Sequence, residues 1–276
     1  MIRLLKIEFR KIMTYRVFWI LTGLYFLFLG LGIFMAEFIL NNWVNNFNKR
    51  FPIPMPHVTL YFFPDIWQNL TFFASIRYIL IFPALVVIIL ITNEFTNKTI
   101  RQNVVNGLSK QEFLFSKLQF ILLLSVVVTI VLGIVIFFLG LTHSDEQQLS
   151  MMGRKLIFLP GFFIQILTYL IFAFFFGFLL KHTGLAIALF TLYSLIIEPV
   201  VYYVLKIPFL QPNNISPYLP VNSVLRIVEY PALPILQKFM GITLQESVSL
   251  LNCGIALLYS AVMIGIVFWL MIRKDL

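Results

Sequence analysis

The sequence predicts an all-α membrane protein with six transmembrane helices. Of its 276 residues, 61% are hydrophobic and only 11% are charged, and the mean hydropathy is +0.96. A soluble domain averages roughly 45–50% apolar and about 25% charged residues. Six separate stretches have the length of about 20 mostly apolar residues that a helix needs to cross a bilayer. Because apolar spans fill most of the chain, we expect one membrane domain over residues 1–276.

The predicted spans follow one another with few long connections. The first is not a cleavable signal peptide, because its apolar core is too long and no small-x-small cleavage site follows it. The connection after the second span (93–117) and the segment before the last span (206–249) are the longest polar parts of the chain. The six spans are expected at 17–40, 70–92, 118–141, 156–180, 183–205 and 250–272.

The net charge of +9 indicates membrane orientation and not a nucleic-acid partner, since the basic residues flank apolar spans. With six spans, both termini and the connections after the second and fourth spans share one side of the membrane. That side carries twelve Lys and Arg residues and the opposite side seven, while Arg77 falls within a span. The positive-inside rule therefore predicts a multi-pass protein of the cell membrane with both termini in the cytoplasm.

Residues 1–16 have the pattern of an amphipathic helix. Ile2, Leu5, Phe9 and Ile12 recur at spacings of three and four, and basic residues occupy the positions between them. Such a helix lies in the membrane interface with its basic side toward anionic lipid head groups. The alternative is a basic N-terminus that serves only to orient the first span.

The connection 93–117 is the longest polar run in the chain. Gly107 is a glycine of the kind that ends helices, and Ser109 with Glu112 forms an S-x-x-E capping box. We therefore expect a helix, a glycine turn and a second short helix that enters the membrane at Leu118. An ordinary solvated loop is the alternative, although a long patterned connection in a compact domain usually has a function.

The residues of this connection resemble the pattern of ABC-2 type permeases, the membrane subunits of ATP-driven exporters. The N-terminal start Leu5-Lys6-Ile7-Glu8-Phe9-Arg10-Lys11-Ile12 is also similar to that family, and the six-span layout extends the resemblance over the whole chain. Lys98 stands where the family often has glycine. The matching residues of the connection are Glu94, Lys98, Thr99, Arg101, Gly107, Ser109, Lys110, Phe113 and Lys117.

The resemblance implies that residues 95–106, which begin at Phe95, form a coupling helix. In that family this helix docks in a groove of a separate ATPase subunit and passes ATP-driven motion to the membrane helices. Glu94 would pair with a basic residue at the membrane boundary, and the other coupling residues would be Lys98, Thr99, Arg101 and Asn103. The resemblance also implies a second permease copy or a homologous permease, with ATP and Mg²⁺ bound by the ATPase.

No catalytic motif accompanies these features. The chain has no G-x-x-x-x-G-K-[ST] phosphate loop, and its three histidines lack metal-ligand spacing. We therefore expect a non-catalytic subunit with no cofactor of its own. A membrane-embedded enzyme and a non-transporting sensor or scaffold stay open as alternatives. The substrate is not readable, since relatives in the resembled family export drugs, antimicrobial peptides, lipids, polysaccharides or ions.

Three charged residues in or near the spans are candidates for a translocation path, because charges in lipid are costly and face protein or water. Arg77 and Glu198 lie at similar depths in the second and fifth spans, and Glu37 lies near the outer end of the first. One interpretation is that Arg77 and Glu198 snorkel or form a structural ion pair across the two spans. The other is that they line or gate the outer part of the path. Pro83 and Pro199 are expected to kink the same spans.

The outer segment 206–249 contains six prolines. Between them, residues 221–230 fit one short amphipathic helix, in which Arg226 and Glu229 would pair at i, i+3. A plain extracellular loop is the alternative.

Overall fold

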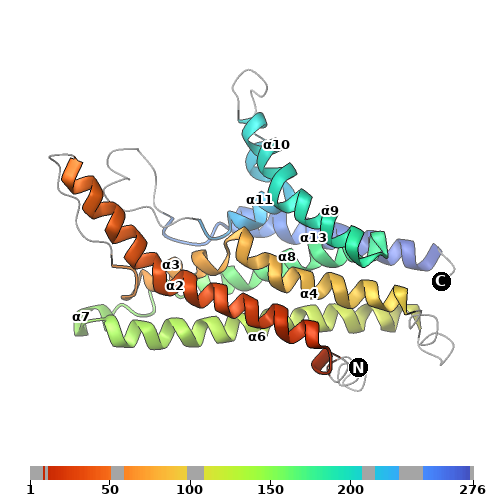
Figure 1. Ribbon diagram of the computed structural model, residues 1–276, viewed down its shortest axis with the longest axis horizontal. Coiled ribbons are helices and arrows are strands. Elements are labelled where there is room, and N and C mark those ends of the chain that lie inside the picture. The colour runs from red at the N-terminus through yellow and green to blue at the C-terminus, as the bar shows by residue number, and fades with distance from the viewer. Residues whose placement is uncertain are drawn as a thin grey trace.

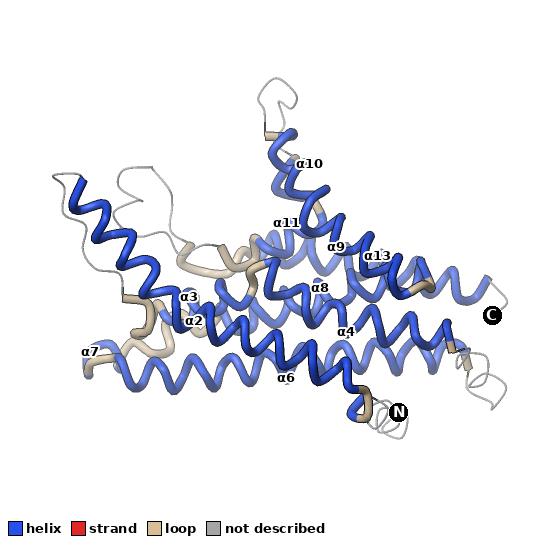
Figure 2. Tube along the Cα trace, in the orientation of Figure 1, coloured by secondary structure: helices blue, strands red, loops and turns tan. Residues whose placement is uncertain are grey.

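The computed structural model describes residue 9 and residues 12–50, 59–97, 109–206, 215–229 and 245–273. Within these ranges the chain is built of helices joined by turns and loops, and no strand is present (Figure 2). In the described part of the chain, six helices are long and apolar enough to cross a membrane, in agreement with the six predicted spans. They are α2 (Arg16–Arg50), α4 (Arg77–Thr96), α6 (Lys110–His143), α8 (Phe158–Leu180), the composite span Thr183–Leu205, and α13 (Leu250–Arg273).

The long helices run up and down along the long axis of the molecule. The start of α2, the end of α4, the start of α6, the α8–α9 turn and the end of α13 lie toward one end of it (Figure 1). We call this the proximal end. The end of α2 and the short helix α7 (Glu146–Leu149) lie at the opposite, distal end. The alternation of ends follows the order expected for six antiparallel spans.

Helix α8 is the centre of the bundle. It packs against α4, α6, α13 and α9 (Thr183–Leu192), and its side chains are buried on most of its circumference. Apolar residues all around a helix are typical of a buried core helix. By contrast α2, the Thr183–Leu205 span and α13 are the least buried of the six. These three helices therefore leave apolar faces for lipid or another chain.

The second span differs from the single helix expected at 70–92. A first helix, α3 (Ile66–Ala74), ends at Ser75, Ile76 is extended, and α4 begins at Arg77. Polar groups hold α3 in place: Asn69 Nδ2 donates to the Leu60 carbonyl at 3.0 Å, and Trp67 Nε1 donates to the Met152 carbonyl at 2.8 Å. Arg77 is therefore the first residue of α4 and not a residue within a continuous span.

The expectation of a second short helix before Leu118 is wrong. Helix α6 begins at Lys110 and continues without a break for 34 residues. The predicted capping box is confirmed, since Ser109 Oγ accepts from the Glu112 N–H at 3.1 Å and Glu112 Oε2 accepts from the Ser109 N–H at 2.9 Å. No glycine or proline between Lys110 and Leu118 interrupts the helix, so cap and span form one element.

The composite span contains a π-helical segment. Helix α9 passes into η1 (Tyr193–Ile197) and then α10 (Glu198–Leu205), which projects from the side of the bundle (Figure 1). The irregularity directly precedes Pro199, where a kink was predicted. Pro83, in contrast, lies inside α4 without interrupting it.

Other boundaries also shift. Helix α2 continues ten residues beyond the predicted end of the first span. The helix expected at 221–230 is the shorter α11 (Pro220–Leu225), preceded by the 3₁₀ turn η2 (Ser216–Tyr218). The predicted Arg226–Glu229 pair is confirmed, with 3.0 Å between Nε and Oε1. It lies after the helix, because α11 ends at Leu225.

The predicted interfacial helix 1–16 lies mostly outside the described residues. Phe9, Ile12 and Met13 are helical, and Ile12 is buried in the main core while Phe9 is exposed. The amphipathic helix as a whole stays a prediction.

Candidate functional site

Two polar clusters lie at the ends of α4, one on each side of its apolar middle. We call the first, around Glu94 and Lys117, the proximal junction. The second, around Arg77, Asn222 and Glu198, is the distal network. Since α4 has 20 residues, it spans about 30 Å at 1.5 Å per residue, so one helix connects the two clusters.

The proximal junction is centred on a buried ion pair. Lys117 Nζ lies 2.8 Å from Glu94 Oε1, and the two side chains are only 4% and 2% exposed. The ammonium group also lies over the Phe113 ring, 5.1 Å from its centroid. The pairing expected for Glu94 with a basic residue is therefore confirmed. The pair joins the last turns of α4 to the beginning of α6.

The same end of α4 is bonded to other parts of the bundle. Thr92 Oγ1 lies 2.8 Å from Thr183 Oγ1 at the start of α9, and Asn93 Nδ2 donates to the Tyr15 hydroxyl at 2.6 Å. The Phe95 ring meets Phe178 of α8 edge-on, with centroids 5.4 Å apart, and Lys181 Nζ lies 5.0 Å from the Phe95 centroid. Phe95, expected to begin the coupling helix, is instead part of the last turn of α4. The junction thus joins segments from five parts of the chain.

The coupling residues beyond Glu94 lie outside the described part of the chain. Lys98, Thr99, Arg101 and Asn103 fall within 98–108, so the coupling helix stays a prediction. The structure does define both ends of this connection. Its entry is the bonded end of α4, and its exit is the Ser109 cap of α6.

The distal network brings Arg77 and Glu198 into one cluster but does not pair them. Arg77 Nη1 donates to the Ser194 carbonyl, and Nη2 donates to Asn222 Oδ1 at 3.1 Å. Glu198 is 1% exposed and accepts from two backbone N–H groups, Val221 at 3.0 Å and Asn222. The predicted direct ion pair is therefore wrong, and Asn222 bridges the two charges.

The helix start at Pro220 explains why the carboxylate prefers backbone partners. The first N–H groups of a helix have no partner within it, and they attract negative charge. Val221 and Asn222 occupy these positions in α11. Glu198 therefore stabilises the start of α11 and fixes it against α10, although more than 20 residues separate them in the chain.

The π-helical segment explains why the Ser194 carbonyl is available to Arg77. The Glu198 N–H, which would reach Ser194 in an α-helix, bonds to the Tyr193 carbonyl instead. The next possible donor would be the backbone nitrogen of Pro199, which carries no hydrogen. The Arg77 guanidinium therefore donates to the Ser194 carbonyl in place of a backbone N–H. The Ser194 hydroxyl lies 2.7 Å from the Tyr169 hydroxyl of α8, and both residues are fully buried.

Ser194, Tyr169 and Asn222 were not singled out from the sequence. Ser194 and Tyr169 are polar groups in apolar spans, which is a weak signal, because most such groups bond within their own helix. Asn222 lies in a proline-rich connection 145 residues from Arg77. Nothing in local spacing indicates that contact.

Glu37, the third candidate for the path, lies apart from this network. It lines a pocket of about 660 Å³ between α2 and α6, together with Tyr61, His143 and Asn41. The Tyr61 hydroxyl donates to the Ile33 carbonyl, and its ring meets His143 edge-on with centroids 5.5 Å apart. Burial raises the pKa of Tyr61, and the Glu37 carboxylate raises it further. The phenol therefore stays a neutral hydrogen-bond donor.

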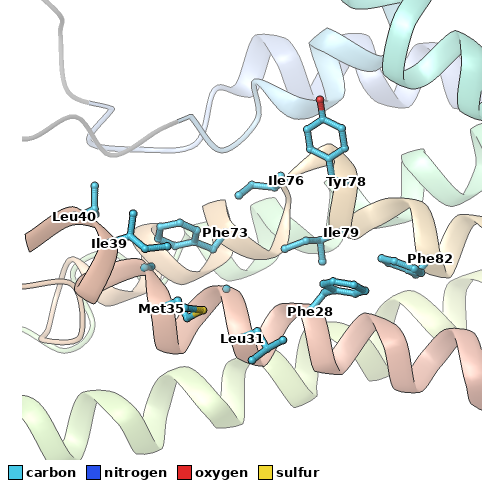
Figure 3. Close-up of a pocket in the computed structure, with 12 residues that line it drawn as sticks. Phe28, Leu31, Met35, Ile39, Leu40, Phe73, Ile76, Tyr78, Ile79 and Phe82 are labelled. Carbon is cyan, nitrogen blue, oxygen red and sulfur yellow. The ribbon is translucent and has the colours of Figure 1, made fainter. Parts of the chain in front are cut away.

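A second groove, of about 650 Å³, lies between α2 and the residues on both sides of the α3–α4 break. Figure 3 shows Met35 and Phe28 on α2 opposite Phe73, Ile79 and Phe82, while the Tyr78 hydroxyl points away from them. The Phe28 and Phe82 rings are stacked at 5.2 Å. This groove is lined almost entirely by apolar side chains, so it suits a hydrocarbon chain better than a charged group.

Among the described residues, no three His, Cys, Asp or Glu side chains come together in a way that could hold a metal ion. No family model matches this chain, and no curated protein matches it.

Proposed function

We propose that the chain is the permease subunit of an ATP-driven ABC exporter of the ABC-2 type. It would work with a separate ATPase that binds ATP and Mg²⁺ and with a second permease, either another copy or a homologue. The permease itself would catalyse no reaction. It would carry its substrate outward through the cell membrane.

The observation that carries this proposal is the proximal junction. A connection that receives force from a partner must be joined rigidly to the spans that respond. The chain enters 98–108 from a helix end bonded to the N-terminal segment, α6, α8 and α9, and leaves it through a capped helix. The buried Glu94–Lys117 pair holds these two ends together. A displaced connection would therefore move α4 and α6 as one body.

Helix α4 offers a route from this junction to the distal end. Its first residue, Arg77, holds the π-helical segment of the fifth span and, through Asn222, the start of α11. Rigid-body movement of packed helices is a common way to transmit such changes. In this proposal, motion at 98–108 changes the position of α10 and α11, where the substrate leaves.

The exposed face of the fifth span supports the second permease copy. Large apolar side chains remain uncovered along α9 and α10, among them Leu192, Ile196, Val200 and Tyr203. The resemblance places the second and fifth helices at the dimer interface. Pairing of this face with another permease would bury these side chains.

The orientation also belongs to the proposal. The proximal end would face the cytoplasm, because the side with both termini carries the larger share of Lys and Arg. Helix 1–16 would lie on the inner lipid surface there, next to the ATPase.

Affinity purification tests the proposal. The tagged chain is extracted from the membranes of its own cells, and copurifying proteins are identified. We expect an ABC ATPase whose rate of ATP hydrolysis changes when the permease is present. A permease that purifies without any ATPase contradicts the proposal. An ATPase that binds without any change in rate favours the sensor or scaffold alternative.

A further inference from the structure

We propose that the pocket between α2 and α6 binds the ammonium head of an amphiphile, with Glu37 as the counter-charge. This inference does not depend on the exporter proposal, because binding can be measured on the isolated chain. The residues that define the pocket are Glu37, Phe34, Phe38, Tyr61 and His143.

The charge of the pocket favours a cation. Glu37 is the acidic residue among those that line it, and no Lys or Arg of the described ranges is among them. Among the described residues, none forms a hydrogen bond or ion pair with the Glu37 carboxylate. A carboxylate in a partly enclosed site gains most from a ligand that brings its own positive charge.

His143 lines the same pocket as Glu37. Its Nδ1 lies 2.9 Å from the Leu139 carbonyl and 2.9 Å from Thr142 Oγ1. Because a carbonyl accepts only from N–H, we assign a ring proton to Nδ1, so this nitrogen is engaged within α6. His143 therefore has only Nε2 left for a ligand in the pocket.

Aromatic rings complete the recognition of a cation. Phe34 and Phe38 are 82% and 63% exposed, which is unusual for phenylalanine unless lipid or a ligand covers it. They lie one helical turn apart on the face of α2 that also carries Glu37. The face of an aromatic ring attracts a cation by about 0.5–2 kcal/mol. Tyr61 supplies a third ring on the opposite wall.

The position and shape of the pocket favour an amphiphile over a small ion. Glu37 lies 21 residues after the start of α2, which places it about 30 Å along the helix. This distance equals the thickness of a bilayer hydrocarbon core, so Glu37 is at head-group level. Below it the wall is apolar, formed by Gly30, Ile33 and Leu139. A head group at Glu37 would place its hydrocarbon tail along this wall.

Two sources can supply an ammonium group on a hydrocarbon tail: a membrane lipid and a free amphiphile. Native mass spectrometry of the purified chain separates them. One arm compares phosphatidylethanolamine with phosphatidylglycerol of the same acyl chains. The other compares hexadecyltrimethylammonium with hexadecyl sulfate. Each arm is measured for the wild type, Glu37→Gln, Glu37→Lys and the control Glu146→Gln, which removes one exposed negative charge from the distal end outside the pocket.

We expect the wild type and Glu146→Gln to retain the ammonium compound over its anionic counterpart in at least one arm. The preference should fall about fivefold in Glu37→Gln, the size of one partly exposed ion pair. It should reverse in Glu37→Lys. Preference in the lipid arm alone identifies a membrane lipid as the occupant.

Equal retention of the ammonium compounds and their anionic counterparts by the wild type overturns the inference. So does an unchanged preference in Glu37→Gln. A variant that loses both compounds equally shows that the pocket collapsed without selecting charge, and this also counts against the inference.

Discussion

At the scale of single residues, the Glu94–Lys117 pair defines where the polar connection meets the bundle. Both groups are almost completely removed from solvent, and the ion pair is 2.8 Å long. Taking two charges out of water costs several kcal/mol each, so such a pair is a poor source of net stability. Its value lies in specificity, because each charge can be buried only where the other lies. The pair therefore fixes the position of α4 relative to α6.

A double-mutant comparison tests this role. Glu94→Gln removes the carboxylate that lies 2.8 Å from the Lys117 ammonium and should destabilise the chain by about 3–5 kcal/mol. The double variant Glu94→Gln/Lys117→Met removes both charges and should recover most of that loss. Thermal unfolding in nanodiscs measures both. Glu229→Gln, which removes one charge of the exposed Arg226 pair, is the control and should cost about 1 kcal/mol or less. Equal losses in the single and double variants would show that the charges do not compensate each other.

The distal network makes a different prediction for Glu198. Glu198→Ala leaves two backbone N–H groups at the start of α11 without an acceptor, at about 1–3 kcal/mol each. Glu198→Gln keeps an oxygen acceptor and should be milder. The exchange Arg77→Glu/Glu198→Arg should not recover stability, because a guanidinium and an N–H are both donors. Unfolding temperature and size-exclusion profile check all three. Recovery in the exchanged variant would instead indicate a direct ion pair.

At the scale of helices, the length of each apolar stretch was enough to predict the spans. The breaks and irregular turns within the spans depend on tertiary contacts. All six spans could be found because each contains about 20 apolar residues. The α3–α4 break could not, because it depends on Asn69 and Trp67 bonding to carbonyls far from α4. The π-helical segment also escaped prediction, although Pro199 marked its neighbourhood. The Ser109 capping box marked the start of α6, but the continuation of this helix into the third span was missed, because a polarity change was taken for a helix end.

The candidate site was also predictable in part: contacts between residues that are close along the chain were predicted, and contacts set by distant segments were not. The Glu94 pairing followed from a motif whose members lie close along the chain. The Arg77–Glu198 contact was expected from similar depth in two spans, but depth says nothing about which backbone groups compete. Asn222 and the Ser194 carbonyl take up the Arg77 guanidinium in place of Glu198. Asn222 comes from a distant loop, and the Ser194 carbonyl lacks a backbone donor because of the π-helical irregularity.

Helix packing provides a matched test at Gly140 on α6. A methyl group at this position would overlap the buried Phe63 ring, whereas one at Gly254 on α13 has open space around it. Gly140→Ala should therefore destabilise the chain by about 1–3 kcal/mol through overpacking. Gly254→Ala should be neutral or stabilising by up to about 1 kcal/mol, because alanine favours helix more than glycine. Unfolding temperatures measured side by side decide it, and equal values for the two variants would refute the close Phe63 contact.

At the scale of the whole molecule, the bundle has a well-packed centre and an uncovered side. Helix α8 is surrounded by α4, α6, α9 and α13, while α10 projects from the bundle with apolar side chains exposed (Figure 1). Two such molecules facing each other through the fifth spans would enclose a path between them, closed or opened by α10 and α11.

The central claim is that the connection between α4 and α6 receives the motion of an ATPase. Charge reversal tests it most directly, through the variant Lys98→Glu/Arg101→Glu. Both residues lie in the predicted coupling helix outside the spans, so membrane insertion should be unchanged. The rate of ATP hydrolysis is measured for the permease–ATPase complex in reconstituted membranes. We predict that the variant binds the ATPase more weakly, or binds it while the rate no longer responds to the permease. Unchanged binding and an unchanged rate would contradict the claim.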